Sequence, residues 1–526
     1  MNSRLVVGSW WLVVLALGLS TLSAAAQTPD RRLAKAVKAN DATTVATLLR
    51  GKADPNVADV DGTTPLQWAV RNNNPGLVDR LLAAGADAKA QNRYGVTAIQ
   101  LACEIGSAPL VTRLLDAGVP ATATGPLGET ALHTCARSGD VAAAKVLVAR
   151  GAPLEAGESW RGQTPLMWAA AQGHVPMIAM LIEAGADPNT RSTVVEWQRQ
   201  RTQEPRDKWL PPGGFTALLL AAREGCASCV AALVDGKANI DDVDPDRQSA
   251  LVLALINGHF DVAGALVDRG IDVNLKDKVG RTALWAAVDA HTMPSSNRPA
   301  PRETDDELSS LDVITKILAR GADVDAALSQ QIPYRTKLDR GGDGVLGAGT
   351  TPLLRAAKAG DVMVVKMLLD RGANAKAATR NGVNGLMMAA NVAAREEDMT
   401  GRNKTQREAI ETIQMLLAAG LDINAADTQG RTAAHGAALW GLTDVVRFLH
   451  KNGARFDVAD KRGFTPLDTA LGQAGGFGFG GTSGVVQDET AKVIQELTGL
   501  KPSPPRAPGS VPPPARGGRN QDDDSN

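Results

Sequence analysis

The sequence predicts an all-α solenoid of about twelve helix-turn-helix repeats joined by β-turn fingers. One observation is that the segment from Gly162 to Asn189 recurs in variant form along most of the chain. Another is that Thr64, Thr97 and Thr130, which each open such a segment, stand 33 residues apart. The third is that 44% of the residues are hydrophobic but only 3% are aromatic, which indicates small aliphatic helix contacts.

Each unit has the same internal order. Thr164-Pro165 marks a turn that leads into a short inner helix, and Gly173-His174 breaks the chain before an outer helix. Gly185-Ala-Asp then ends the outer helix and opens a β-turn finger. This unit resembles the ankyrin repeat, whose period is about 33 residues. The resemblance implies that the repeats stack, because one unit cannot bury its own apolar face.

The repeats keep one phase along the chain. After Thr130 they begin at Thr164, Thr216, Ser249, Thr282, Thr351, Asn384, Thr432 and Thr465. Insertions near 190–212 and 326–349 enlarge fingers, and those at 291–304 and 394–405 separate an inner from an outer helix. Residues 30–57 form a degenerate first repeat, which suits a polar amino-terminal cap.

Residues 1–26 have the pattern of a secretory signal peptide. They carry one charge, Arg4, then an apolar stretch from Trp10 to Leu19, and then the small residues Ser23 to Ala26. The apolar stretch is shorter than the roughly 20 residues of a membrane span, although an uncleaved anchor is the alternative. We therefore expect cleavage after Ala26 and a periplasmic or secreted protein that does not insert into the membrane.

We expect the solenoid to occupy residues 27–498 and a disordered, Pro-rich tail to occupy 499–526. The tail has too little apolar surface to fold. The formal net charge is −1, or −2 without Arg4, so nothing points to nucleic acid as a partner. We expect a monomer that binds another protein.

The search for enzyme motifs finds none. The chain has no Gly-x-Ser-x-Gly elbow, no His-Glu-x-x-His and no phosphate loop, so we expect no catalysis, cofactor or metal. The glycines between 475 and 481 look like a nucleotide loop only superficially, because no strand precedes them. The resemblance implies a structural role for His133, His174, His259 and His435, which would hydrogen-bond neighbouring turns.

The four cysteines fall into two pairs. Cys103 and Cys135 replace small alanines of adjacent inner helices, where a buried thiol behaves as a small hydrophobic group. Cys226 and Cys229 open an outer helix, where they could pack, form a structural disulfide or act as a redox pair.

The candidate binding residues come from two places. The resemblance implies that residues just before the mid-repeat Gly face the concave surface, and these are Arg71, Glu104, Arg137, Arg223, Glu224, Lys358 and Trp440. The enlarged fingers add Trp197, Trp209 and Tyr334. A basic ladder with aromatic residues would suit an acidic, partly apolar partner. The alternatives are solvated helix charges and mobile solvent loops.

The sequence therefore predicts an exported, non-enzymatic protein-binding scaffold. Two other functions stay open: a thiol-active periplasmic protein that uses Cys226 and Cys229, and a secreted effector that binds a host protein.

Overall fold

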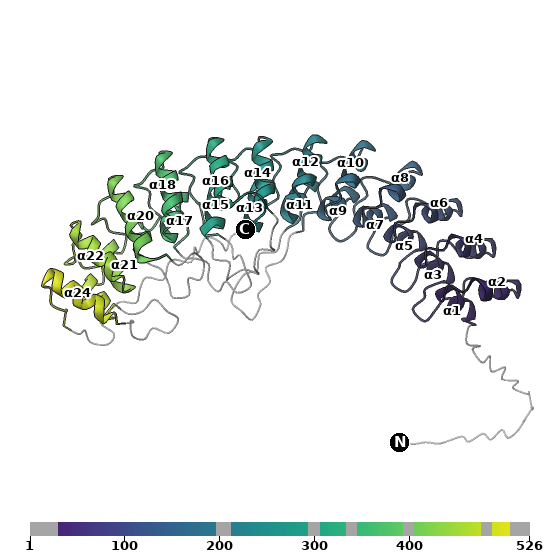
Figure 1. Cartoon of the computed structure of the whole chain (residues 1–526), viewed down its shortest axis with the longest axis horizontal. Helices are drawn as coiled ribbons and strands as arrows, with labels where there is room; N and C mark the ends of the chain where they lie inside the picture. Colours follow the sequence, from purple (N-terminus) through teal and green to yellow (C-terminus); the bar gives the residue numbers. More distant parts are fainter. Residues whose placement is uncertain are drawn as a thin grey trace, which may run out of the picture.

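The computed structural model describes residues 30–195, 212–292, 306–332, 345–392, 404–474 and 486–504. These residues form twenty-four helices in two layers, and the predicted all-α solenoid is confirmed (Figure 1). The inner helices are α1 (Arg32–Lys38), α3 (Pro65–Arg71), α5 (Ala98–Glu104), α7 (Ala131–Ser138), α9 (Pro165–Ala171), α11 (Ala217–Glu224), α13 (Ala250–Asn257), α15 (Ala283–Thr292), α17 (Pro352–Ala359), α19 (Gly385–Ala389), α21 (Ala433–Leu439) and α23 (Pro466–Ala470). The outer helices are α2 (Ala42–Arg50), α4 (Pro75–Ala83), α6 (Ala108–Asp116), α8 (Val141–Ala149), α10 (Val175–Glu183), α12 (Ala227–Asp235), α14 (Phe260–Asp268), α16 (Ser310–Ala319), α18 (Val362–Asp370), α20 (Gln406–Ala418), α22 (Thr443–Lys451) and α24 (Asp488–Thr498).

The repeated threonines begin the inner helices. Thr64 is the N-cap of α3, and its side chain accepts a hydrogen bond from the backbone N–H of Gln67. The side-chain oxygen of Gln67 in turn accepts a hydrogen bond from the backbone N–H of Thr64, which completes a capping box. Thr97 and Gln100 repeat this arrangement in α5. The cap satisfies backbone groups that the helix itself leaves unpaired, which explains why this residue marks each repeat.

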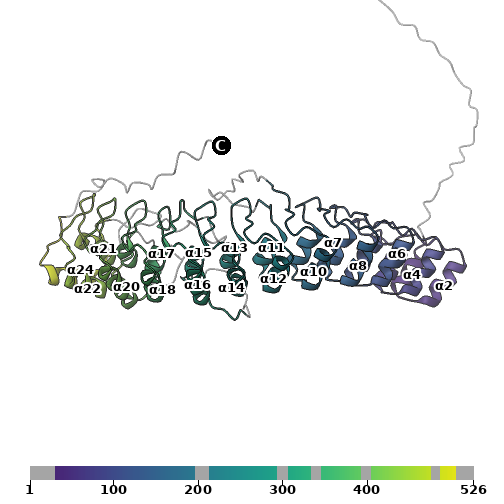
Figure 2. The same ribbon diagram turned by 90° about the horizontal axis from the view of Figure 1, so that it is seen from above.

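Small residues let neighbouring inner helices approach closely. Ala69, Ala102, Ala136 and Ala169, one on each of four successive inner helices, are fully buried. Each inner helix packs against the inner helices of the repeats before and after it and against its own outer helix. The array therefore forms one extended core that curves into an arch (Figure 1) and runs as one elongated row when seen from above (Figure 2).

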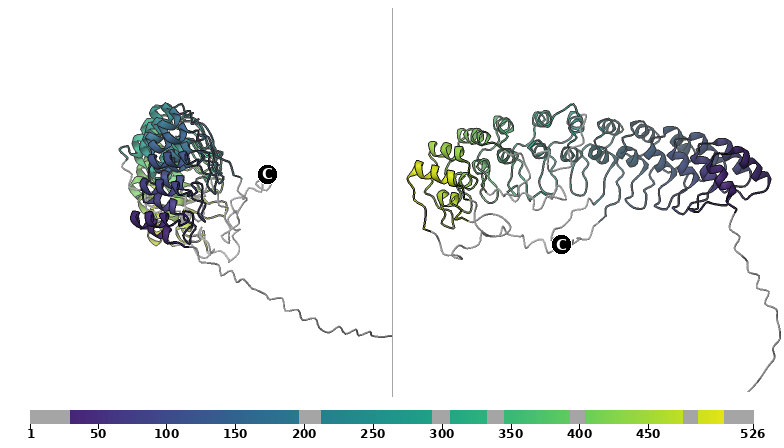
Figure 3. Two further views of the ribbon diagram at one scale, coloured as in Figure 1. Left: turned by 90° about the vertical axis from the view of Figure 1, so that its right-hand side faces the viewer. Right: turned by 60° about the horizontal axis from the view of Figure 1, so that its bottom comes forward.

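The fingers project from one side of the helix layers and contact one another (Figure 3). The backbone N–H of Arg93 donates to the carbonyl of Asp61 in the preceding finger at 3.1 Å, and Ser159 N–H donates to Leu127 O at 2.6 Å. The close approach requires glycine at Gly62, where φ is +82° and an added Cβ would lie 3.0 Å from the Arg93 nitrogen. Hydrogen bonds between fingers hold the turns in fixed positions.

Most of the expected insertions and both ends of the chain lie largely outside the described residues. The segments 293–305 and 393–403 fall between inner and outer helices, and 196–211 and 333–344 fall between repeats. Residues 1–29 and 505–526, which contain the expected signal peptide and most of the tail, lie outside the described residues. The last helix ends at Thr498, and the segment that follows still contacts the last repeat, because the Ser503 N–H and hydroxyl donate to the Asp468 carboxylate at 2.9 and 2.8 Å.

Candidate protein-binding surface

Arg71, Glu104 and Arg137 lie exposed at the carboxyl ends of three successive inner helices, α3, α5 and α7. The guanidinium of Arg71 lies 5.6 Å from the centre of the Trp68 ring, and that of Arg137 lies 5.6 Å from the Trp168 ring. Within the described ranges neither arginine forms an ion pair. Both are positioned by an aromatic ring and keep their charge available for a partner.

The expected basic ladder is interrupted further along the array. Arg223 is half-buried and pairs with the adjacent Glu224 at 2.8 Å, so these two charges largely cancel. Lys358 is half-buried at the end of α17, and its carbonyl accepts a hydrogen bond from Lys404 Nζ at 2.8 Å. Trp440, the C-cap of α21, is also half-buried. Trp197, Trp209 and Tyr334 lie outside the described residues.

Sequence reasoning missed a buried ion pair in the middle of the array. The Arg355 Nε of α17 donates to an Asp289 carboxylate oxygen of α15 at 2.7 Å, and only 1% and 4% of the two side chains are exposed. Arg355 stands at the position where other inner helices carry Leu101, Leu220 or Leu253. An Arg at a Leu position was the available signal, but its partner lies 66 residues away across two insertions.

Lys404, just before α20, joins two inner helices. Its Nζ donates to the carbonyls of Lys358 and Met388 at 2.8 and 3.2 Å and to the Asn391 side-chain oxygen. Burial lowers the pKa of Lys404 to about 7, and the charges of Lys358 and Arg355 act in the same direction. Three acceptors match the three hydrogens of an ammonium group, so the contacts make this lysine a cap for the ends of α17 and α19.

Ser310, His291 and Asp361 lie together at the edge of the array. The Ser310 hydroxyl is 2.8 Å from His291 Nδ1, and His291 Nε2 is 3.1 Å from an Asp361 carboxylate oxygen. These are the residue types of a hydrolase triad. The Asp361 carboxylate also caps α18 through the Val364 N–H at 3.1 Å. The contacts join α15, α16 and α18, which accounts for them without catalysis.

All four cysteines are disulfide-bonded. Cys103 and Cys135, expected as separate buried thiols, are bonded to each other, which corrects that prediction. They stand on the adjacent inner helices α5 and α7, where stacking brings their Cα atoms within 4.7 Å. Cys226 and Cys229 form the second disulfide, one of the alternatives expected, at the amino end of α12.

The histidines hold neighbouring repeats together. His133 Nε2 bonds the Gln163 carbonyl at 2.9 Å, and His435 Nε2 bonds the Phe464 carbonyl at 3.1 Å. His174 and His259 bond the carbonyls of the preceding repeat, Arg137 O at 2.9 Å and Arg223 O at 3.0 Å. These contacts support the structural role that the repeat resemblance implies.

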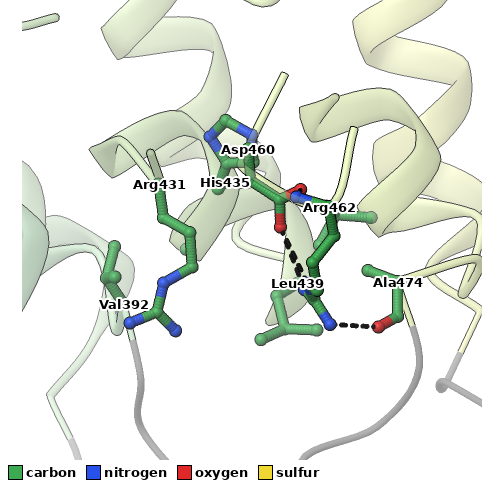
Figure 4. Close-up of a pocket in the computed structure, with 9 residues that line it drawn as sticks. Val392, Arg431, His435, Leu439, Asp460, Arg462 and Ala474 are labelled. Carbon is green, nitrogen blue, oxygen red and sulfur yellow. Dashed lines mark hydrogen bonds and ion pairs between the residues drawn. The ribbon is translucent and has the colours of Figure 1, made fainter. Parts of the chain in front are cut away.

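A small pocket of about 20 Å³ lies near the carboxyl end of the array, between α21 and α23 (Figure 4). It is lined by Val392, Arg431, His435, Gly436, Leu439, Asp460, Arg462, Thr469 and Ala474. Arg431 pairs with Asp427 at 2.6 Å, and Arg462 pairs with Asp460 at 3.0 Å and donates to the Ala474 carbonyl at 2.9 Å. Both guanidinium groups are neutralised by buried carboxylates, and the volume is close to that of one water molecule.

Exposed large apolar side chains lie on each of the first five fingers, at the tip in the first four and, in the fifth, just before residues 196–211, which the structure does not describe. They are Val60, Tyr94, Leu127, Trp160 and Val194, with 54% to 71% of each residue exposed, and together they are called the finger-tip row. Among the described residues only Ile105, Met363 and Val486 are other large apolar residues with comparable exposure. Sequence reasoning missed the row because it considered the inner-helix positions and the insertions, although four of the five residues stand one or two places before a turn glycine.

Neither a metal-binding cluster nor a membrane-spanning helix is found among the described residues. No group of three or more His, Cys, Asp or Glu side chains there is arranged to hold a metal ion. The helices described above include none with the length and apolar character needed to cross a bilayer.

Comparison with known proteins gives one consistent picture. The family model for ankyrin repeats in three copies matches residues 33–124, 101–192, 194–277 and 404–476, and the single ankyrin repeat model matches 348–380. The E3 ubiquitin-protein ligase KEG of Arabidopsis thaliana is 29% identical over 276 residues, 49% of this chain and 16% of that protein. Ankyrin repeat and SAM domain-containing protein 6 of Danio rerio is 28% identical over 230 residues, 40% of this chain and 29% of that protein.

These matches are partial in length. The chain spans less than a third of either curated relative. Among solved structures, the human ASB11 ankyrin repeat domain has a TM-score of 0.38 and 23% identity, with 46% of this chain and 98% of that chain covered.

Proposed function

Because the chain belongs to the ankyrin repeat family, we propose that it is an exported, non-enzymatic scaffold that binds another protein. Ankyrin repeats are typical protein-binding scaffolds, and the proposal extends this property to an exported protein. The observation that carries it is a continuous array of repeats with exposed charged side chains, Arg71, Glu104 and Arg137, on three successive inner helices. Repeat proteins keep the scaffold and vary its surface, so the surface residues determine the partner.

Export is supported by the sequence of residues 1–26 and by the two disulfides. Disulfides persist in oxidising compartments such as the periplasm or the cell exterior and are rare in reducing ones. Cell fractionation with amino-terminal sequencing tests this part. We expect a chain that begins at or near Gln27 in the periplasmic or secreted fraction, with all four cysteines blocked against alkylation. Intact Met1 in the membrane pellet would contradict export.

Partner capture tests the binding function. The mature chain is used as bait in extract from its native compartment, and retained proteins are identified by mass spectrometry. A Trp197→Ala and Trp209→Ala double variant should capture the partner at least about tenfold more weakly, with its melting temperature little changed. Arg71→Ala with Arg137→Ala is the companion variant for the concave surface. If the tryptophan variant melts early, those side chains support the solenoid; if it melts normally and binds normally, the enlarged finger is not the site.

A thiol-active role is the second candidate, and the Cys226–Cys229 disulfide favours it. Cys226 is half-buried at the N-cap of α12, and Cys229 is fully buried one turn later. In reduced form, a thiolate at that place would be favoured by the helix terminus. Cys226→Ser with Cys229→Ser should abolish any disulfide exchange with a dithiol substrate. A scaffold would keep its partner in the same variant.

We also propose that the protein catalyses no reaction. The unmodified mature chain should therefore hydrolyse ester and amide substrates no faster than the Ser310→Ala variant does. Faster turnover by the unmodified chain would identify the Ser310, His291 and Asp361 group as a hydrolase site. A secreted effector that binds a host protein is a further version of the scaffold role and would be recognised by the origin of the captured partner.

A further inference from the structure

The exposed apolar residues of the finger-tip row are not scattered singly over the surface. Five of the eight large apolar residues that are exposed in the described chain stand on successive fingers, one per finger. The later fingers carry Asp246, Lys278, Gln429 or Lys461 near their tips instead. A contiguous row of this kind, bounded by polar fingers, is typical of an interaction surface rather than of chance exposure.

Backbone hydrogen bonds link three of the four pairs of neighbouring fingers in the row; between the second and third fingers the donor position is Pro126, which has no N–H. The Arg93 N–H donates to Asp61 O, Ser159 to Leu127 O and Thr193 to Arg161 O, with distances between 2.6 and 3.1 Å. A partner therefore cannot add a strand along these groups and must be recognised through side chains. The same bonds fix the row before binding, which lowers the entropy cost of recognition.

The charge around the row is positive. Arg93 and Arg161 stand beside the tips, and Arg161 lies 4.5 Å from the centre of the Trp160 ring. Neither has an ion pair within the described ranges. With Arg71 and Arg137 on the inner helices, four guanidinium groups without an ion pair in the described ranges border the first five repeats, against one exposed carboxylate at the same level, Glu104 of α5.

The carboxylates of the same fingers are turned into their own turns. Asp61 accepts from the Thr63 N–H at 2.9 Å, and Glu129 accepts from the Leu127 N–H at 3.0 Å. Glu158 is buried and accepts from the Trp160 and Arg161 N–H groups at 2.6 and 2.9 Å. These acids stabilise the turns, so the charge presented to a partner comes mainly from the arginines.

We propose that the finger-tip row binds an extended acidic segment of a partner protein whose apolar side chains pack on the tips. The inference rests on the proposed scaffold function and names the chemistry of its partner. A row one residue wide suits an extended chain better than a broad protein face. The four arginines favour acidic residues between the apolar ones, because opposite charge speeds encounter and fixes register.

The probe is a fluorescein-labelled peptide that alternates Glu with Leu and is long enough to cover five fingers, with fluorescence polarisation as readout. The mature full-length chain should bind it, and binding should weaken as salt rises. Tyr94→Ser with Trp160→Ser should weaken binding roughly tenfold or more. Met363→Ser with Val486→Ser removes equally exposed apolar residues away from the row and should change binding by less than about twofold.

A charge exchange tests the electrostatic part. The double variant Arg93→Glu with Arg161→Glu should no longer bind the Glu-Leu peptide and should bind a matching Lys-Leu peptide. Thermal melting of each variant confirms that the array is intact. Equal binding of the Glu-Leu peptide by the tip variant and the unmodified chain overturns the proposal, as does failure of the unmodified chain to bind it.

Two other occupants are distinguished by the same variants. Binding of phosphatidylserine vesicles that is lost in the tip variant, without peptide binding, would assign the row to a membrane surface and overturn the proposal. Self-association that is lost in the tip variant would assign it to a second copy, with the same consequence. If the tip variant still captures the native partner, the row proposal fails while the scaffold function stands.

Discussion

The buried carboxyl group of Asp244 lowers the stability of its finger at neutral pH. Burial raises its pKa to about 6, and the carboxylates of Asp246 and Asp277 act in the same direction. Its oxygen accepts a bond from the Gln248 N–H at 2.7 Å, which an amide oxygen would preserve. The folded pKa lies above the unfolded value, so the unfolded state binds fewer protons between pH 3.8 and 6 and stability falls as the pH rises through that window.

We therefore expect Asp244→Asn to stabilise the protein at pH 7.5 by roughly 1–2 kcal/mol and to have little effect near pH 3.5. Hydrogen exchange of α11 and α13 at the two pH values measures this, because a long repeat array need not unfold in a single transition.

Asp277→Asn, at the same place in the next finger, is the matched control. It would remove the 2.9 Å partner of the buried Arg281 guanidinium and should destabilise at pH 7.5. Equal effects of the two substitutions would contradict the proposed origin of the Asp244 shift.

The buried Arg355 and Asp289 pair leads to a second prediction at this scale. Arg355→Leu alone leaves a buried carboxylate, and Asp289→Asn alone leaves a buried guanidinium, so each should cost about 3 kcal/mol in the opening of α15 and α17. The double variant should recover part of this loss, because Leu is the residue that three other inner helices carry at the Arg355 position. Hydrogen exchange of α15 and α17 in the single and double variants measures the coupling free energy between Arg355 and Asp289. Strictly additive effects would show that the pair does not interact as described.

Individual residues were predictable only where the repeat fixes their environment. The capping threonines and the bridging histidines follow from their place in the unit. Arg355 with Asp289 and Cys103 with Cys135 are contacts between different repeats, and the sequence of one repeat does not show which residue faces it from the next. The bond between Cys103 and Cys135 required the stacking distance of α5 and α7.

At the scale of the helix, the third residue after the N-cap is glutamine in some inner helices and histidine in others, and both side chains have the same role. Gln67 of α3 donates to the carbonyls of Ala90 and Val96 at 3.1 and 2.8 Å, bonding the following finger as His133 of α7 does. Burial lowers the pKa of His133 and of His435, and in both cases desolvation is the largest cause. Both positions link an inner helix to the next repeat, but only histidine makes the link sensitive to acid.

We expect His133→Gln with His435→Gln to reduce the loss of stability in acid. The folded pKa of each histidine lies below its unfolded value of 6.5, so the unfolded state binds more protons and stability falls as the pH drops below that value. Melting at pH 8 and pH 5 should show a smaller loss of stability at the lower pH in the variant than in the unmodified chain. His435→Gln alone is the control for the edge contact of His133 with Trp168, which it leaves intact. An unchanged acid shift would mean that other groups set the acid sensitivity.

Helix order was predictable for a physical reason. The Thr-Pro turn, the mid-repeat glycine and the small core residues are local signals, and they recur in phase, so each repeat confirms the others. The positions of the insertions followed from the places where the interval between successive repeats exceeds one period. The finger-tip row was not predicted, since exposure at a tip depends on the fixed contact between neighbouring fingers and not on the composition of one turn.

For the whole molecule, the principal property is that every repeat is held only by its neighbours. The pairs α9 with α11 and α11 with α13 use the same inner-helix contacts, and the buried faces of α11 and α13 are both built from alanine and leucine with few larger groups. An array of this kind has no central core on which all parts depend. Removing one complete unit should therefore leave two surfaces that still fit.

Deletion of residues 216–248, which contain α11, α12 and one finger, is expected to leave a folded protein, because α13 and α14 then pack on α9 and α10 in the same register. Deletion of 226–248 removes α12 but leaves α11 without its outer helix, and its buried Leu218 and Leu219 would be exposed to water. Both deletions remove the Cys226–Cys229 disulfide, so its loss cannot explain a difference between them. Circular dichroism should show native helicity per residue and a cooperative melt only for the complete deletion. Equal unfolding of both would mean that the stability of the array is not local to neighbouring repeats.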